Sequence, residues 1–288
     1  MDNTGNRKLS LGEIQQRELE MLKEFDRVAR KYKLRYTMCA GTLLGAVRHR
    51  GFIPWDDDID VSMPRPDYEK LVRLNRKRNL WSKGLKLASF EDGTMDTPFM
   101  KLFCDDVVIK EKNYSEKYVQ NLWIDIFPVD GLPYNEEDMK LHYQLALNLC
   151  KLSTSSVVRN GYGTTKAKIV LKTLLFKPAA NMVGRKRIAA LQRKLALKYS
   201  YSHAKKVGMV TWAYDGPGQA LRKAEYEDLI EMDFEGCTFY GIKAWDKYLS
   251  GVFGNYMQLP PEEDRLTHDF EAYYVESEEK KLKQEEES

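Results

Sequence analysis

The sequence is poor in the features that mark secreted, metal-finger or membrane-spanning chains. Its 288 residues include only four cysteines, which are scattered and form neither a CxxC pair nor another metal-ligand spacing. We therefore expect reduced thiols rather than disulfides. No run of 18 apolar residues is present, and the polar N-terminus does not resemble a secretory signal. These absences predict a cytoplasmic protein that does not span a membrane.

A strong excess of charge of either sign is also missing. The chain has 46 Lys and Arg residues against 43 Asp and Glu residues, for a net charge of +3. This near balance does not indicate a protein that binds nucleic acid. Hydrophobic residues make up 43% of the chain and aromatic residues 11%, which is enough for a substantial core in one large domain or two unequal ones.

Hydrophobic periodicity and turn residues predict an α+β fold whose second half is mainly helical. A capping box at Ser10 and Glu13 begins an amphipathic helix that runs to about Tyr32. Strands are expected at 35–40, 58–63, 85–89, 99–103, 106–110 and 122–127, with helices at 43–49 and 67–74. From residue 135 to about residue 200 the pattern is mainly helical, with a break at Pro178, and it is followed by two short strands around 227–241 and a helix near 243–253.

The strongest chemical signal is a group of acids in PWDDDIDV, residues 54–61. Asp58 and Asp60 are two apart on the expected strand, so both carboxylates point to the same face, and Asp56 has the same parity. Like charges this close need a compensating cation, and oxygen ligands suit Mg²⁺. A solvated acidic turn is the plain alternative, but the apolar neighbours of Asp60 argue against it.

A third acid lies inside an apolar strand. Asp125 is part of LWIDIFP, where a bare carboxylate is costly unless it is paired or bound to a metal. An Asp that pairs with an Arg or caps a turn explains this residue equally well when it is taken alone. A third carboxylate on a strand beside the first two is nevertheless what a metal site for phosphoryl chemistry requires. Asp130, in PVDGLP, is expected to be a turn residue.

The segment before the acids is suited to binding a phosphate. Gly41 and Thr42 follow a strand and open a helix, whose free N–H groups and dipole favour an anion. Arg48 and His49 bring donors to the far end of the same helix, and Lys101 lies in a later apolar strand. Each basic residue has an ordinary alternative, which is a surface charge at a helix C-terminus or, for Lys101, an ion pair with an acid a few residues along.

A longer resemblance includes these acids. The chain is similar to the LicD family of lipopolysaccharide and teichoic-acid choline-phosphate transferases, related to the fukutin-type ribitol-phosphate transferases, in the segment GTLLGAVRHRGFIPWDDDIDV at residues 41–61. Further similar segments are RPDYEKL (65–71), DIFPVDGLP (125–133) and YLSGVFGNYMQLPPEEDRLTHDF (248–270). The resemblance implies a nucleotidyltransferase-like mixed sheet flanked by helices, with a mainly helical additional region.

The resemblance also implies roles for individual residues. Carried over by motif, Asp58, Asp60 and Asp125 are the ligands of Mg²⁺ or Mn²⁺, and Asp56 is an additional catalytic acid. Residues expected to contact the donor nucleotide and its phosphates are Gly41, Thr42, Arg48, His49, Lys101 and Trp55. Two candidates for C-terminal substrate contacts are Arg265 and His268.

The reaction implied by the resemblance is transfer of phosphocholine from CDP-choline to a hydroxyl of a cell-surface glycan precursor, with release of CMP. Ethanolamine or ribitol in place of choline, a nucleotidyl transfer that releases pyrophosphate, and an inactive scaffold are the alternatives. Ring faces usually recognise a quaternary ammonium group. The candidate rings are Trp55, Trp123, Tyr240, Tyr273 and Tyr274, although core packing is the favoured interpretation of Trp123.

Four parts are expected along the chain. They are a nucleotidyltransferase-like catalytic core at 1–134, a mainly helical and partly basic region at 135–225, strands and helices at 226–275 that pack back on the core, and a charged tail at 276–288. Residues 164–200 hold ten Lys or Arg and no acid. A basic amphipathic stretch is typical of a peripheral contact with the inner membrane surface, where a lipid-linked acceptor would lie. A helix packed on the domain with a solvated basic face is the simpler interpretation.

Overall fold

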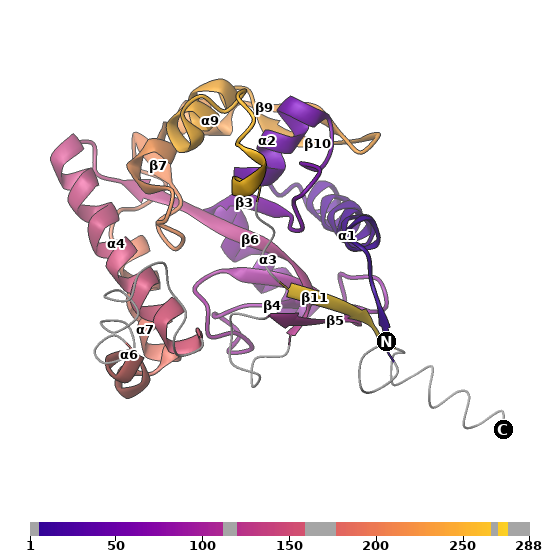
Figure 1. Ribbon diagram of the computed structural model, residues 1–288. Helices are drawn as coiled ribbons and strands as arrows, with labels where there is room; N and C mark the ends of the chain where they lie inside the picture. Colours follow the sequence, from indigo (N-terminus) through magenta and orange to yellow (C-terminus); the bar gives the residue numbers. More distant parts are fainter. Residues whose placement is uncertain (1–5, 112–119, 159–176, 266–269, 276–288) are drawn as a thin grey trace.

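The computed structural model describes residues 6–111, 120–158, 177–265 and 270–275. Its centre is a mixed sheet of nine strands among these residues (Figure 1). Along its main path the strands are β1 (Arg7–Lys8), β11 (Phe270–Tyr274), β5 (Met100–Glu111), β6 (Gln120–Leu132), β3 (Asp60–Pro64) and β2 (Thr37–Met38). The remaining strands are β4 (Leu85–Ala88) beside β5, β7 (Lys206–Gly208) beside β6, β8 (Leu221–Arg222) beside β7, and the separate hairpin of β9 (Leu229–Phe234) and β10 (Cys237–Ile242). The predicted α+β class is confirmed.

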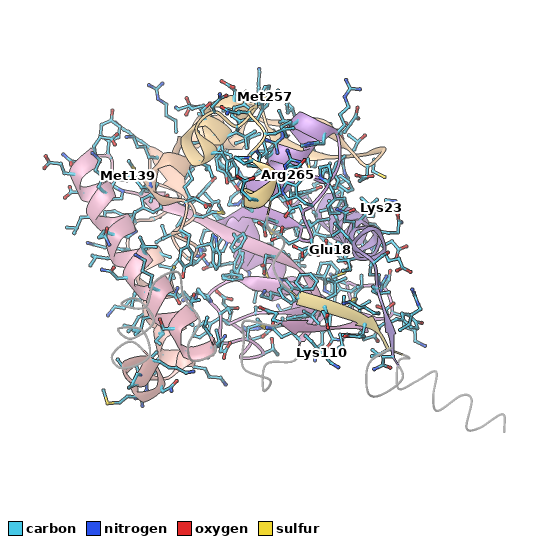
Figure 2. All side chains as sticks on the ribbon, in the orientation of Figure 1. Glu18, Lys23, Lys110, Met139, Met257 and Arg265 are labelled. Atoms are coloured by element: carbon cyan, nitrogen blue, oxygen red, sulfur yellow. The ribbon has the colours of Figure 1, made fainter. Side chains whose placement is uncertain are left out.

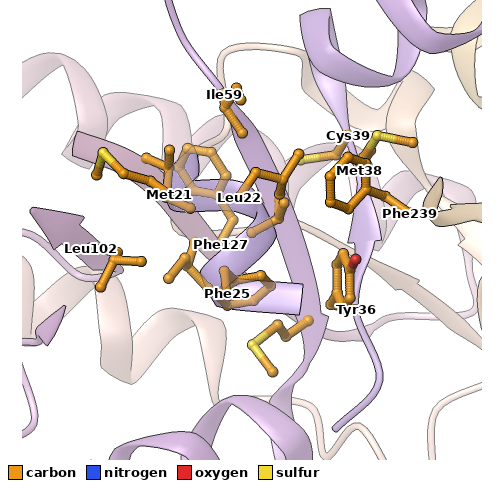
Figure 3. Packing of buried hydrophobic residues seen from close by; sticks show 14 of the residues in the cluster. Met21, Leu22, Phe25, Tyr36, Met38, Cys39, Ile59, Leu102, Phe127 and Phe239 are labelled. Atoms are coloured by element: carbon orange, nitrogen blue, oxygen red, sulfur yellow. The ribbon is translucent and has the colours of Figure 1, made fainter. Parts of the chain in front are cut away.

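Helix α1 (Leu11–Lys31) lies against the sheet. It begins at the predicted capping box, in which the Ser10 hydroxyl accepts from the Glu13 N–H and the Glu13 carboxylate accepts from the Ser10 N–H. Met21, Leu22 and Phe25 on its inner side are buried in the main core (Figure 3). This packing fixes α1 beneath the strands that carry the acids.

The other helices are arranged on both sides of β6. They are α2 (Ala40–His49), α3 (Arg65–Lys77), α4 (Glu136–Val157), α6 (Lys177–Val183), α7 (Arg185–Ala196), α8 (Lys223–Glu227) and α9 (Trp245–Phe253), with short 3-10 turns η2 (Gly216–Gln219) and η3 (Glu262–Asp264). Figure 1 shows α4, α6 and α7 on one side of the molecule and α1 on the other, with β6 crossing between them.

The mainly helical region has a small core of its own. Asn135 caps α4, because its side-chain oxygen accepts from the N–H groups of Glu137 and Asp138. The buried residues of this second cluster are Leu132, Met139, Tyr143, Ala146, Cys150, Ala196, Val210 and Ala213. Pro178, expected as a break, lies in the first turn of α6, where a proline is tolerated. The division of the chain into four parts stays a prediction.

Three details of the predicted strands are different. The strand expected at 58–63 begins at Asp60, so Asp58 belongs to the preceding loop and the shared-strand argument for the pair does not hold. The strands expected at 99–103 and 106–110 form the single strand β5, whose pairing with β6 shifts register between Phe103 and Val108. Strands β1, β7 and β8 have two or three residues each, which is too short to leave a periodic pattern, and the five-residue strand β11 was also not expected.

Asp130 is not a turn residue. It lies inside β6 and is 1% exposed, and its two carboxylate oxygens accept from Arg65 Nε and Nη2, both at 2.7 Å. The Gly and Pro residues around Asp130 suggested a turn, but Arg65 at the start of α3 neutralises the carboxylate. The strand therefore continues to Leu132.

The basic stretch at 164–200 is described only from residue 177 onward, and the remainder lies outside the described residues. In α7, Ile188, Ala189 and Ala196 are buried. Arg185 pairs with Asp96, and Arg193 pairs with Glu91. The described part thus packs on the rest of the protein, and membrane contact by the stretch stays a prediction. No helix among the described residues is long and apolar enough to cross a bilayer.

Candidate functional site

Three charged side chains form a row across the centre of the sheet. Asp60 on β3 is in register with Asp125 on β6, and Asp125 is in register with Lys101 on β5. Residues directly opposite each other in a sheet project from the same face, so the three groups are neighbours. Lys101 Nζ lies 3.0 Å from Asp125 Oδ1, so its partner is a carboxylate on the neighbouring strand rather than an acid a few residues along, and its contact with a phosphate stays a prediction.

Trp123 completes this row by holding both partners of the ion pair. Its indole N–H donates to Asp125 Oδ2 at 3.1 Å, and Lys101 Nζ lies 3.8 Å from the centre of a Trp123 ring. Trp123 is half-buried and packs against the main core, as favoured from the sequence, and it also contacts both charges. An indole bonded to one partner and stacked on the other restricts the orientation of both charges.

The environment of Asp60 disfavours its charged form. Burial raises the pKa of Asp60 well above its ordinary value, and the nearby carboxylates of Asp58 and Asp125 raise it further. No Lys or Arg among the described residues forms an ion pair with Asp60. A carboxylate that is buried among other carboxylates lowers its energy by binding a cation, and all the donors are oxygen, as Mg²⁺ prefers.

The acids do not form a closed metal cage by themselves. Within the described ranges, no group of three His, Cys, Asp or Glu side chains converges closely enough to hold a metal ion. Mg²⁺ usually takes only one or two carboxylates and completes its octahedron with water and substrate phosphates. The residues therefore fit an ion that arrives with a phosphorylated substrate better than a permanently bound structural ion.

The loop between α2 and β3 brings Asp56 to the start of α2. A Cβ atom on Gly41 would lie 2.7 Å from Asp56 Oδ2, so a larger residue at position 41 would displace this carboxylate. Thr42 is buried, and its hydroxyl accepts from the Asp60 N–H at 2.8 Å. Gly41 and Thr42 are thus beside the acids as expected, with Thr42 fixing the beginning of the acidic strand.

Arg48 and His49 lie at the opposite end of α2. Seven residues of helix separate Arg48 from Gly41, which is about 10 Å. Arg48 Nη1 donates to the backbone oxygen of Tyr256 at 2.8 Å, and burial lowers the pKa of its guanidinium. Burial, and then the charge of Arg48, lower the pKa of His49. Arg48 thus anchors the C-terminal segment, whereas the His49 ring contacts that of Trp55, and the expected phosphate contacts of both residues stay predictions.

Trp55 and Arg265 are brought together from distant parts of the chain. Arg265 Cζ lies 4.8 Å from the centre of the Trp55 ring, and Arg265 Nε donates to the backbone oxygen of Pro260. Figure 2 labels Arg265 above the sheet, on the segment that follows η3. This contact connects the C-terminal family-like segment to the acidic loop. His268 lies outside the described residues.

Asp215 belongs to this neighbourhood and was not expected from the sequence. It precedes η2, and its negative charge is among those that raise the pKa of Asp60. Burial raises the pKa of Asp215 itself, and its Oδ2 is buried without a hydrogen-bond partner among the described residues. Its sequence context, AYDGPGQ, reads as an ordinary turn, so only the fold reveals it.

Glu18 on α1 is a second acid that the sequence did not reveal (Figure 2). It is 1% exposed, and its Oε2 has no hydrogen-bond partner in the described part of the chain. Burial raises the pKa of Glu18 well above the ordinary 4.5, and the charges of Asp58, Asp57 and Asp56 raise it further. In the amphipathic pattern of α1, Glu18 occupies a position where an apolar residue is expected. This mismatch was the only sign in the sequence that Glu18 is buried.

The raised pKa of Glu18 predicts that the stability of metal-free protein depends on pH. Because its pKa is higher in the folded state, that state binds more protons above pH 4.5, and the free energy of unfolding falls as pH rises. Glu18→Gln removes this titration, so its melting temperature in EDTA should fall less than that of the wild type between pH 5 and pH 8. At pH 8 the variant should melt several degrees higher, since 1 kcal/mol corresponds to roughly 2–4 °C in a chain of this size.

The control for this prediction is Glu20→Gln, an exposed acid on the same helix. It should leave the pH slope unchanged. Parallel melting curves for the wild type and Glu18→Gln across this pH range would contradict the account of Glu18.

The carboxylates of Asp60 and Asp125 lie side by side on a mixed sheet, close to the start of a helix. Residues 33–147 match the family model described as LicD/FKTN/FKRP, nucleotidyltransferase domain. The chain is also 30% identical over 279 residues to the lipopolysaccharide cholinephosphotransferase LicD of Haemophilus influenzae, covering 93% of this chain and 99% of that protein. The protein belongs to the LicD family.

A shorter similarity is found in two rickettsial proteins of uncharacterised function. A protein of Rickettsia prowazekii is 38% identical over 55 residues, which is 19% of this chain and 21% of that protein. One of Rickettsia typhi is 42% identical over 48 residues, which is 17% of this chain and 16% of that protein. These local matches add nothing on substrate.

Proposed function

We propose that this protein transfers phosphocholine from CDP-choline to a hydroxyl of a lipopolysaccharide- or teichoic-acid-type glycan precursor on the cytoplasmic side of the membrane. The observation that carries the proposal is the Asp60–Asp125–Lys101 row, found in a chain similar over 93% of its length to a lipopolysaccharide cholinephosphotransferase. A row that combines paired acids with one lysine suits a reaction whose substrate is a diphosphate.

Asp60 and Asp125, with Asp58 from the preceding loop, are the residues that would hold Mg²⁺. When bound, the ion neutralises charge on the diphosphate of the donor. Lys101 adds a fixed positive charge beside Asp125, and Trp123 keeps that pair in place. The protein thereby supplies orientation and electrostatic stabilisation, which are the main contributions to phosphoryl transfer.

The covalent step replaces the phosphoanhydride bond of the donor with a phosphodiester linkage to the acceptor. The acceptor hydroxyl oxygen bonds to the phosphorus that bears choline, and the bond from that phosphorus to the CMP oxygen breaks. The hydroxyl proton passes to a carboxylate, for which Asp125 and Asp56 are the two candidates. Asp125 already has Lys101 as its partner, whereas Asp56 lies against Gly41 at the start of α2.

A donor panel tests this proposal. In the presence of Mg²⁺, CDP-choline should raise the melting temperature by about 5–10 °C at a hundred times its Kd, because a ligand of the folded state stabilises it by about 2.7 kcal/mol there. CMP should give a smaller shift, and EDTA should remove most of the effect. With an acceptor glycan, mass spectrometry should detect one added phosphocholine and an equal amount of CMP.

The other donors on the panel are CDP-ethanolamine, CDP-ribitol and nucleoside triphosphates. If CDP-ethanolamine or CDP-ribitol gave a larger shift in melting temperature and supported turnover, the transferred group would be that alcohol phosphate instead of phosphocholine. Release of pyrophosphate from a triphosphate would indicate a nucleotidyltransferase instead. Binding of every nucleotide without turnover of any acceptor would indicate a scaffold.

A further inference from the structure

Aromatic rings flank the charged row along the same face of the sheet. Phe127 is two residues beyond Asp125 on β6 and therefore projects from the same face. Its ring centre is 4.7 Å from that of Phe99, which precedes β5. A strand advances about 3.3 Å per residue, so these rings lie roughly 7 Å along the strands from the charged row. A phosphate group followed by a two-carbon chain can span that separation.

Trp212 and Tyr214 stand over this second row. The ring centre of Trp212 is 6.0 Å from that of Phe99 and 5.9 Å from that of Phe127, and Tyr214 is 4.8 Å from Trp212. Phe99 and Phe127 are buried, whereas Trp212 is 37% exposed and Tyr214 is 40% exposed. The four rings thus form one cluster in which Phe99 and Phe127 are buried. Trp212 and Tyr214 lie at its surface and have ring area accessible to a ligand.

Four of the five rings suggested by the sequence as choline sites already have one of the protein's own cations over them. Measured from the cationic centre to the ring centre, these pairs are Arg265 over Trp55 at 4.8 Å, Lys101 over Trp123 at 3.8 Å, Arg30 over Tyr240 at 4.3 Å and Lys110 over Tyr273 at 4.7 Å. By contrast, no Lys or Arg in the described ranges lies over Trp212 or Tyr214. Within the described part of the chain, the exposed surfaces of these two rings are therefore open to an external cation.

An acidic residue follows these two rings in the sequence. Asp215 directly follows Tyr214, and its Oδ2 has no hydrogen-bond partner among the described residues. Because Asp215 also acts electrostatically on Asp60, the Trp212–Asp215 segment approaches the acids from the helical half of the chain. Aromatic faces beside a carboxylate suit a quaternary ammonium group, which offers no N–H donor and is held by its diffuse charge.

We propose that Trp212 and Tyr214 bind the quaternary ammonium group of the donor and thereby select a trimethylammonium alcohol over other CDP-linked alcohols. This inference rests on the proposed function. Phe99 and Phe127 support the two rings from below, and Asp215 balances the bound charge. Specificity then comes from the helical half, while the phosphates bind at the sheet.

Calorimetry with three ligands tests the assignment. The ligands are CDP-choline, CDP, and the CDP ester of 3,3-dimethylbutanol, a neutral analogue in which carbon replaces the choline nitrogen. Wild-type protein with Mg²⁺ should bind CDP-choline about tenfold more tightly than the neutral ester. Trp212→Leu and Tyr214→Leu, which keep apolar packing without a ring face, should each reduce this preference, and the double variant should abolish it. Affinity for CDP should stay within twofold in all of them.

The matched control is Tyr134→Leu, which removes an exposed ring at the far end of β6. It should keep the full preference for CDP-choline. A double variant that binds CDP normally and still prefers CDP-choline tenfold would overturn the ring assignment while leaving the proposed function intact. Wild-type protein that binds CDP-choline no better than the neutral ester would also overturn it. If turnover instead required CDP-ribitol, the proposed function itself would fail. If Trp212→Leu does not fold, Tyr214→Leu alone decides.

Discussion

Asp60→Asn and Asp125→Asn should each lower kcat by roughly a hundred- to a thousandfold, the size of loss found when one preorganised electrostatic group is removed from an active site. Asp58→Asn should have a similar effect. Asp60 and Asp125 are paired directly across β3 and β6. Each carboxylate therefore has its own fixed position, and neither can replace the other. Turnover is measured as CMP release at saturating donor and Mg²⁺.

The two sheet variants should differ in stability although they agree in activity. Asp60 is half-buried beside other acids whose charges raise the pKa of its carboxyl group, so Asp60→Asn should raise the melting temperature of metal-free protein. Asp125→Asn should lower it, because Lys101, which is 7% exposed, loses its ionised partner. Asp105→Asn, an exposed acid on β5, is the control and should change neither quantity. Wild-type turnover in any of the three site variants removes that residue from the proposed metal site.

Arg65→Met should destabilise the protein by about 3–5 kcal/mol, because it leaves the Asp130 carboxylate buried and unpaired. The two hydrogen bonds of 2.7 Å between these residues connect α3 to β6 in a region almost closed to water. At roughly 2–4 °C per kcal/mol, the melting temperature should drop by about 10 °C. The double variant Arg65→Met with Asp130→Leu should recover much of this loss, since it removes both charges.

The control pair for this cycle is Lys243 and Asp228, which are 3.6 Å apart and mostly exposed. Lys243→Met should cost less than about 1 kcal/mol, as exposed ion pairs usually do. If Arg65→Met costs no more than Lys243→Met in urea denaturation, the buried pair does not stabilise the fold in the way described.

The sequence was sufficient to identify the acids of the sheet but not their arrangement. Asp60 and Asp125 stood out because each is a carboxylate next to apolar strand residues. Their alignment depends on parallel pairing between two strands that are 65 positions apart, which no local pattern specifies. The metal and phosphate roles assigned to these residues stay predictions.

Residues that were missed or misjudged share a physical cause. Asp130 and Asp215 both occur in Gly- and Pro-rich sequence, which is typical of turns. For Asp130, a distant arginine reverses that local preference and keeps the strand extended. For Asp215, the short η2 segment and its packing against α9 bring a turn-like sequence close to the acids. In both cases tertiary contacts determine the local structure, and such contacts leave no pattern in the neighbouring sequence.

The sheet that carries the acids depends on strands from nearly the whole chain, and this limits how modular the protein is. The family model covers residues 33–147, but β6 pairs with β7 at Lys206–Gly208, and β5 pairs with β11 at Phe270–Tyr274. A fragment limited to residues 33–147 would lose both strand pairings, together with α1 and Asp215. It would expose unpaired edge strands, which favour aggregation. Exchange of specificity between relatives is therefore better attempted by grafting the short segment at 211–216 than by swapping the matched region.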